Sequence, residues 1–194
     1  MKRVKAAIFC IAASLLGMSG QLAAQSNPPK VRPAPDFTLT DSQGKQVSLA
    51  EFRGRVVVLQ FFQTTCPVCQ KHAPMLEKLY RTYKDRGVAV MGVSHNVNSP
   101  EALQAFAKTY DITYSLLVGD LEIAVRYLGL SPQNPKFDVP HYFVIDREGR
   151  IVQEIDPTHA SPEFTRNPEG TLRQTIDEAL AGAPAAHSPG TASH

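Results

Sequence analysis

Two apolar runs on either side of a helix, within residues 55–93, limit the possible folds of this chain more than any other feature. Residues 55–62 (RVVVLQFF) are nearly all apolar and rich in β-branched and aromatic side chains, which is typical of a strand buried on both faces. Residues 88–93 (VAVMGV) have the same character. Between the two runs, apolar side chains recur at helical spacing, at Met75, Leu76, Leu79 and Tyr83. The order predicts a right-handed βαβ unit with parallel strands.

The rest of the chain predicts further strands and helices of an α/β fold. Residues 131–138 (SPQNPKFD) have the composition of a loop, which either binds a client protein or is a solvated connection. The other expected elements are a β-hairpin over 37–49, helices over 99–110 and 121–128, a short edge strand at 116–118, strands at 141–146 and 151–155 around a tight turn, and a closing helix over 170–182.

Cys66 and Cys69 lie where the first strand meets the helix, which we expect to begin at Cys66 or Pro67 and to run to about Arg86. The N-terminus of a helix presents unpaired N–H groups and a partial positive charge, and both stabilise a thiolate. Cys66 would gain most from this position, whereas Cys69 lies one turn later and is more sheltered. We therefore expect Cys66 to attack a partner disulfide and Cys69 to resolve the mixed disulfide.

Charge and cysteine content exclude some classes of protein. The 194 residues include 20 Lys plus Arg and 18 Asp plus Glu, and the net charge of +2 is far from the basic excess with which most nucleic-acid-binding proteins contact phosphate. We therefore expect no nucleic-acid partner. Three cysteines are also too few for a fold held together by disulfides.

The first residues have the pattern of a secretory signal peptide, with three basic residues, an apolar run of about 13 residues and small residues that end at Ala24. A membrane-spanning helix needs about 20 apolar residues, so we expect cleavage and a periplasmic protein without stable membrane insertion; a retained anchor is the alternative. Cleavage would leave a net charge of −1 and two cysteines. The expected divisions are a signal peptide at 1–24, a Pro-rich linker at 25–35, the folded domain at 36–182 and a disordered tail at 183–194.

Four blocks in a fixed order resemble a known family. They are residues 34–39 (APDFTL), 56–76 (VVVLQFFQTTCPVCQKHAPML), 88–94 (VAVMGVS) and 139–152 (VPHYFVIDREGRIV). In these blocks the chain resembles the TlpA/ResA-like exported thiol-disulfide oxidoreductases, which have an AhpC/TSA-like (redoxin) domain and belong to the thioredoxin superfamily. The resemblance implies a thioredoxin-like fold with a central mixed β-sheet flanked by helices, an N-terminal β-hairpin and an inserted helix-strand segment. It also implies that Pro140 is in cis and faces the cysteine pair.

The resemblance also implies a function. It indicates a reductase of specific disulfides in exported proteins, which works through Cys66 and Cys69 and needs no cofactor or metal. The client would lie against Val139 and Pro140, and Pro67 and Val68 would tune the redox potential without adding charge. Electrons would come from a membrane thiol reductant. Relatives serve cytochrome c maturation, copper-centre assembly or general thiol homeostasis.

Three residues depart from the family pattern. Thr65 stands where most relatives have Trp, and Gln60 stands where thioredoxin has a buried, titrating Asp. His72 occupies a position where some relatives have Glu. A positively charged His72 would stabilise a nearby thiolate, which predicts a more acidic cysteine pair than in the relatives with Glu. The alternative is that His72 is a solvated helix residue.

Other functions of the cysteine pair stay open at this point. A peroxiredoxin-like thiol peroxidase is one, although Gln63 stands where those enzymes have Thr or Ser. A copper-handling module is another, because two thiolates with the imidazole of His141 nearby suit Cu(I). A structural zinc site would need His72, His95 or His141 as further ligands. An inert structural disulfide is a further alternative, but it would close a very small loop and so constrain the unfolded chain little. Gln70 after Cys69 excludes a c-type haem motif.

Overall fold

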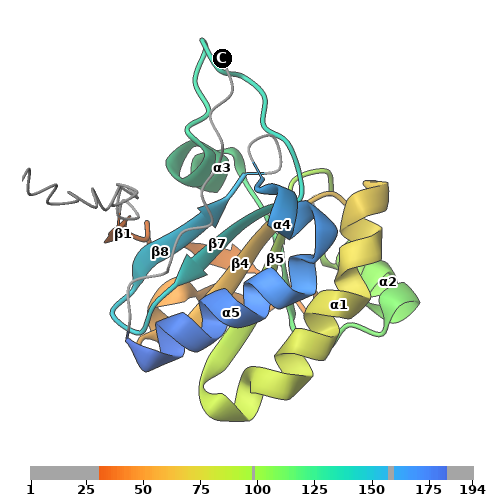
Figure 1. Ribbon diagram of the computed structural model, residues 1–194. Coiled ribbons are helices and arrows are strands. Elements are labelled where there is room, and N and C mark those ends of the chain that lie inside the picture. Colours follow the sequence, from red (N-terminus) through yellow and green to blue (C-terminus); the bar gives the residue numbers. More distant parts are fainter. Residues whose placement is uncertain (1–30, 98, 157–159, 183–194) are drawn as a thin grey trace, which may run out of the picture.

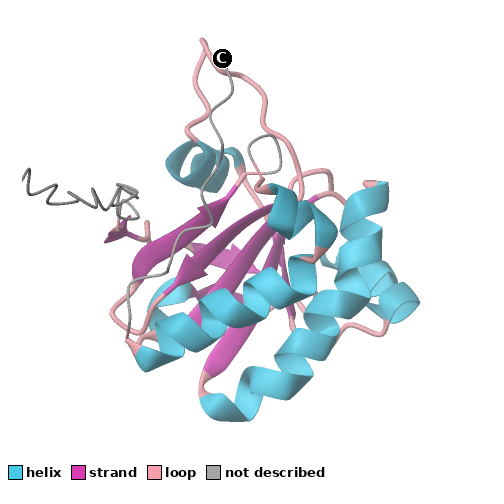
Figure 2. Ribbon diagram, in the orientation of Figure 1, coloured by secondary structure: helices cyan, strands magenta, loops and turns pink. Residues whose placement is uncertain are grey.

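The structure is a computed structural model of the chain, and it describes residues 31–97, 99–156 and 160–182. A six-stranded sheet in the order β1-β8-β7-β4-β5-β6 forms its centre, and β2 and β3 form a separate hairpin (Figures 1 and 2). The strands are β1 (Arg32–Pro33), β2 (Thr38–Thr40), β3 (Gln46–Ser48), β4 (Val56–Phe62), β5 (Val88–Ser94), β6 (Ser115–Val118), β7 (His141–Ile145) and β8 (Arg150–Ile155).

Helices cover both faces of this sheet (Figure 1). The helices are α1 (Pro67–Tyr83), α2 (Pro100–Tyr110), α3 (Leu121–Leu128), α4 (Pro162–Arg166) and α5 (Pro168–Ala181), with 3-10 turns at Leu49–Phe52 and Lys84–Arg86. Apolar side chains of α1, α2, α4 and α5 pack in one buried cluster on the first face. Those of the β2–β3 hairpin and α3 pack in a second cluster on the other face. This arrangement of helices on both faces of a central sheet confirms the prediction of a thioredoxin-like α/β fold with a central mixed sheet.

The predicted βαβ unit is present. Strand β4 pairs in parallel with β5 and antiparallel with β7, which makes the sheet mixed, and α1 connects β4 to β5. All seven residues of β4 and of β5 are buried, as their apolar sequences require. Side chains of β4 alternate between the faces, so that Gln60 and Phe62 lie on the α1 side and Phe61 on the α3 side. The β-hairpin, the edge strand and the closing helix also agree with the predicted positions.

The N-terminal boundary differs from the expectation of a linker over 25–35. Arg32 and Pro33 form strand β1, which pairs with β8 at the edge of the sheet, and Ala34 is buried. An edge strand tolerates Pro because one side of the strand needs no hydrogen-bond donor. The predicted signal peptide, residues 25–30 of the linker and the predicted tail lie outside the described residues. Helix α4 was not expected, because five residues are too few to show a helical period.

Glu77 joins α1 to the turn that precedes β6. The side chain is buried, at 5% exposure, and its carboxylate accepts hydrogen bonds from the backbone N–H (2.7 Å) and the hydroxyl (2.6 Å) of Thr113. It also pairs with Arg81. Burial raises the pKa of Glu77, but the hydrogen bonds from Thr113 and Arg81 outweigh burial, and the net effect lowers this pKa. The charged form of Glu77 therefore stabilises the folded state.

Glu77→Gln is expected to lower the free energy of unfolding by about 2 kcal/mol at pH 7, because a charged acceptor of several hydrogen bonds is lost. A carboxylate whose pKa is depressed in the folded state stabilises that state above its unfolded pKa of about 4.3, and this stabilisation is lost as the pH falls through the folded pKa. The difference in the free energy of unfolding between wild type and variant should therefore disappear in acid. Urea denaturation at several pH values measures it, with the exposed Glu101→Gln as control. A gap that does not change with pH would contradict this role.

Candidate active site

The sulfur of Cys66 lies at the N-terminus of α1. Cys66 is the N-cap of this helix, with extended backbone angles, and its Sγ accepts the backbone N–H of Cys69 at 3.2 Å. Pro67 follows at the first helical position, where the missing N–H has no cost. On its other side, Sγ lies 3.8 Å from the carbonyl oxygen of Val139, and the peptide bond from Val139 to Pro140 is cis. Cys66 and the Val139–Pro140 segment, which the resemblance predicts to act together, are thus in contact.

The two cysteines differ in exposure and in acidity. Cys66 is partly exposed, between the exposed residues Thr65, Pro67 and Val68, whereas Cys69 is 1% exposed. Burial, and then the hydrogen bond with Cys66, raise the pKa of Cys69 to about 12. A large partner can therefore reach only Cys66, and Cys69 stays protonated at neutral pH until something removes its proton. This asymmetry matches the predicted roles of attacking and resolving thiol.

Asn96, which sequence analysis missed, holds the turn in front of Cys66. Its side-chain oxygen accepts the backbone N–H of Thr64 at 2.8 Å, and its amide nitrogen donates to the Thr64 hydroxyl at 2.9 Å. Gln70 of α1 donates to the Thr64 carbonyl at 2.8 Å. The turn between β4 and α1 is therefore fixed from both sides. A polar residue two positions after buried β5 was the available signal, since parallel strands end at the same edge of a sheet.

A buried polar group lies beneath the cysteines on the α1 side of the sheet. Gln60 donates to the Tyr142 hydroxyl at 3.1 Å, and that hydroxyl lies 2.6 Å from Nδ1 of His72. His72 is only 8% exposed, so it is not a solvated helix residue. Burial, and then the charge of Lys71, lower the pKa of His72, so its ring is neutral near pH 7. The expectation that His72 carries a positive charge is therefore wrong, because the buried position disfavours the imidazolium.

His141 and His95 lie on the opposite face of the sheet. The His141 ring stacks on Phe143 at 4.9 Å, and its Nε2 is 3.0 Å from Oε1 of Glu154. The His95 ring stacks on Phe61 at 5.2 Å. The structure does not bring His141 toward the cysteines, which removes the observation that favoured a copper site. Within the described part of the chain, no three His, Cys, Asp or Glu residues are placed to hold a metal ion.

The loop over residues 131–138 projects beyond the end of the sheet near α3 (Figure 1). Its first turn is closed by paired backbone hydrogen bonds of 3.0 Å between Ser131 and Asn134. Phe137 is the residue of the loop that packs inward, with its ring edge-on to His95 at 5.1 Å. The loop is therefore anchored next to the active-site edge, and its role in client binding stays a prediction.

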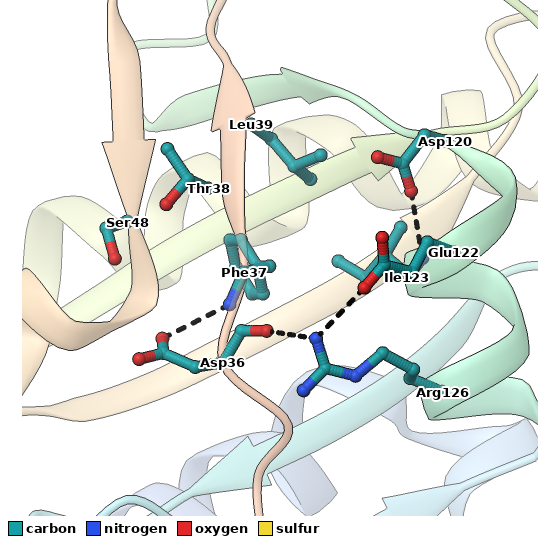
Figure 3. Close-up of a pocket in the computed structure, with 9 residues that line it drawn as sticks. All are labelled: Asp36, Phe37, Thr38, Leu39, Ser48, Asp120, Glu122, Ile123 and Arg126. Atoms are coloured by element: carbon teal, nitrogen blue, oxygen red, sulfur yellow. Dashed lines mark hydrogen bonds and ion pairs between the residues drawn. The ribbon is translucent and has the colours of Figure 1, made fainter.

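A separate pocket of about 320 Å³ lies between the β2–β3 hairpin and α3. Figure 3 shows the residues that line it. Arg126 donates to the backbone carbonyl of Asp36 at 2.7 Å, and Asp120 accepts the N–H of Ile123 at 2.9 Å. The first contact ties α3 to the segment that precedes β2, and the second caps the N-terminus of α3. No cysteine is among the residues that line this pocket. Its lining residues are Asp36, Phe37, Thr38, Leu39, Ser48, Asp120, Glu122, Ile123 and Arg126.

Residues 31–154, more than half of the chain, match the model of the AhpC/TSA family. The chain belongs to the AhpC/TSA family. One relative is the thiol-disulfide oxidoreductase ResA of Geobacillus kaustophilus, which is 31% identical over 137 residues, 70% of this chain and 74% of the relative. The ResA of Bacillus thuringiensis subsp. konkukian is 32% identical over 122 residues, 63% of this chain, and the match spans 66% of its length.

Solved structures support the same fold. A thioredoxin-family thiol:disulfide interchange protein from Chlorobium tepidum TLS superposes with a TM-score of 0.61 at 24% identity, over 81% of this chain and 99% of that protein. The predicted ResA-like family membership and the thioredoxin-like fold are therefore confirmed. No helix within the described ranges combines the length and the apolar composition that crossing a bilayer requires.

Proposed function

We propose that this protein is a thiol-disulfide oxidoreductase that reduces specific disulfides in exported proteins. The observation that carries the proposal is the pair of unlike thiols at the N-terminus of α1, with Cys66 accessible and Cys69 buried behind it. The activity named for the ResA relatives supports the same chemistry.

The cycle follows from the positions of the two sulfurs. The Cys66 thiolate attacks one sulfur of the client disulfide, which forms a mixed disulfide and releases the other client sulfur as a thiolate. Cys69 loses its proton and attacks Cys66, which forms the Cys66–Cys69 disulfide and releases the second client thiolate. The client gains two electrons and the protein loses two. An upstream membrane thiol reductant, as predicted from the resemblance, would return the protein to the dithiol.

The Val139–Pro140 segment supplies the docking edge in this proposal. The Val139 carbonyl lies 3.8 Å from the Cys66 sulfur, and a proline at position 140 removes an N–H that would otherwise face the thiols. An extended client segment placed along this edge brings its disulfide to Cys66. The exposed apolar side chain of Val68, at 50% exposure, lies next to Cys66 on the surface that the client would cover.

The signal-peptide pattern over residues 1–24 supports an exported, periplasmic location. Thiol pairs exported to an oxidising compartment need a supply of electrons to act as reductants, which is why a membrane thiol reductant belongs to the proposal. Cytochrome c maturation is one process that such a reductase would serve.

A redox titration of the chain from Gln25 tests the proposal. Counting free thiols by alkylation and mass in a series of dithiothreitol buffers should show one reversible two-electron transition of Cys66 and Cys69. A potential near or below thioredoxin's roughly −270 mV supports a reductase, whereas one near −120 mV indicates an oxidant. If no reversible pair forms, or if peroxide drives Cys66 to sulfenic acid, disulfide exchange is the wrong function and thiol peroxidase chemistry takes its place.

A further inference from the structure

The ring of His95 packs between three groups on the α3 face of the sheet. It stacks on Phe61 of β4, with the ring centroids 5.2 Å apart and the planes 12° from parallel. The ring of Phe137, in the loop over residues 131–138, meets it edge-on at 5.1 Å. A β-carbon at Gly119 would lie 3.1 Å from Cε1 of His95, so glycine leaves the space that the imidazole fills. The loop is therefore held to the sheet through the ring of His95.

The imidazole has a cost at this place that another aromatic ring would not have. Its Nε2 is buried and finds no hydrogen-bond partner among the described residues, and a buried polar atom without a partner destabilises the fold. A phenylalanine ring would keep both ring contacts without this cost. The property that distinguishes an imidazole from a phenyl ring is that it takes up a proton near neutral pH.

Protonation of His95 is opposed by its surroundings. Burial lowers the pKa of His95 to about 4, and the charge of Asp120 offsets burial only in part. The Asp120 carboxylate caps α3, where it accepts the N–H of Ile123 at 2.9 Å. The titratable residues on the elements around the ring are Asp120, Tyr127, Lys136, Asp138, His141 and Glu154. An imidazolium is favoured only where the packing opens to water, and Phe137, which lies in a loop, is the neighbour that moves at least cost.

The loop that His95 holds leads directly to the active site. Phe137 precedes Val139 by two residues, and the Val139 carbonyl lies 3.8 Å from the Cys66 sulfur. The residue after His95 is Asn96, which holds the turn in front of Cys66. Two consecutive side chains after β5 thus fix the two segments that border the attacking thiol.

We propose that neutral His95 holds the loop over residues 131–138, and with it the Val139 docking edge, in the position that accepts a client, and that protonation of His95 in acid releases the loop. Solvent supplies the proton, and the N–H of the imidazolium is the only bond that forms. The inference rests on the proposed function, because Val139 is a docking edge only in a protein that exchanges disulfides. His95 is a positioning residue, since it acts on the client through Phe137 and Val139.

The direction of the pH effect follows from proton linkage. An exposed imidazole has a pKa of about 6.5, whereas the packed ring of His95 has a pKa of about 4, so the open loop binds the proton more tightly. The closed loop therefore has its full stability above about pH 6.5 and loses it as the pH falls from there toward about 4. Between pH 7 and pH 5, this linkage shifts the equilibrium toward the open loop by about 20-fold.

Proton NMR of the reduced chain from Gln25 tests the coupling without any substrate. Phe137→Ala is expected to raise the pKa of His95 from about 4 toward about 6.5, because coupling between the loop and the proton is reciprocal. The Cε1–H signal of His95, identified by its loss in His95→Phe, reports this shift. Gln133→Ala, at an exposed position of the same loop, is the matched control and should leave the His95 pKa unchanged. An unchanged pKa in Phe137→Ala would overturn the inference.

Two substrates separate positioning from chemistry at pH 7. A cyclic peptide without ionisable side chains, closed by one disulfide, must lie along Val139, whereas hydroxyethyl disulfide is small enough to react at Cys66 without this edge. His95→Ala is expected to raise the KM for the peptide about fivefold and to change kcat less than about twofold, which is the effect of losing one aromatic pair. His95→Phe keeps both ring contacts and should have the wild-type KM. Both variants should reduce hydroxyethyl disulfide at the wild-type rate, and an equal loss on both substrates would contradict the positioning role.

The pH dependence distinguishes His95 from a residue that only fills space. The ratio of kcat/KM for the peptide to kcat/KM for hydroxyethyl disulfide cancels the titration of the attacking thiol, which both reactions share. In the wild type this ratio should fall by about threefold from pH 7 to pH 5, whereas in His95→Phe it should stay constant. A constant ratio in the wild type, or an equal fall in His95→Phe, would refute the release in acid. A wild type that reduces neither disulfide would instead contradict the proposed function, while the NMR result would still report on the loop, so the two failures are distinguishable.

Discussion

Cys66→Ser is expected to abolish turnover of disulfide substrates, with a loss of at least about 10³-fold. A serine hydroxyl is far too weakly acidic to supply the anion that attacks a disulfide, and buried Cys69 cannot replace Cys66 because a client cannot reach it. The measurement is the initial rate of reduction of a protein disulfide with dithiothreitol as the electron source. Any activity of this variant above the uncatalysed rate would mean that Cys66 is not the attacking thiol.

Cys69→Ser should fail in a different way. Cys66 is still at the N-terminus of α1, so the first attack proceeds, but no second thiol is present to resolve the product. The client should accumulate as a mixed disulfide on Cys66, visible by mass spectrometry without reductant. The double variant Cys66→Ser/Cys69→Ser is the control and should trap nothing. Equal trapping by Cys66→Ser alone would reverse the assigned order of the two thiols.

The scaffold around these thiols could be predicted from the sequence because its signals are local. The run over residues 55–62 is apolar without alternation, and this pattern alone indicates a strand covered on both faces. Pro67 and the apolar spacing after it mark the start of α1. These two signals place Cys66 at the junction before any tertiary contact is known.

The partners of the site could not be predicted because they depend on pairing between distant strands. Gln60 meets Tyr142 only because β4 and β7 pair antiparallel in one register, and a shift by one residue would put Tyr142 on the α3 face. Asn96 reaches Thr64 across the ends of β4 and β5. The burial of His72 depends on rings from α4 and β7, which lie far along the chain, so the sequence alone could not show it.

Phe61→Ala is expected to lower the free energy of unfolding by about 3–5 kcal/mol, which is the usual cost of removing a buried aromatic side chain. Phe61 is fully buried on the α3 face of β4. Its ring lies 5.2 Å from that of His95, 5.5 Å from that of Tyr127 and 5.7 Å from that of Phe143. The variant therefore leaves a cavity among three rings, which cannot close without moving the centre of the sheet.

Urea denaturation of the reduced protein measures this loss, with Phe52→Ala as the matched control. Phe52 is partly buried, and its ring contacts the guanidinium of Arg55 at 5.3 Å at the edge of the same cluster. Removal of the Phe52 ring should lower the free energy of unfolding by about 1 kcal/mol, because solvent fills the space. A similar loss for both variants would show that the α3 face is not tightly packed around Phe61. Because Phe61 and the cysteines lie on different faces, Phe61→Ala that remains folded should still react at Cys66, which separates stability from chemistry.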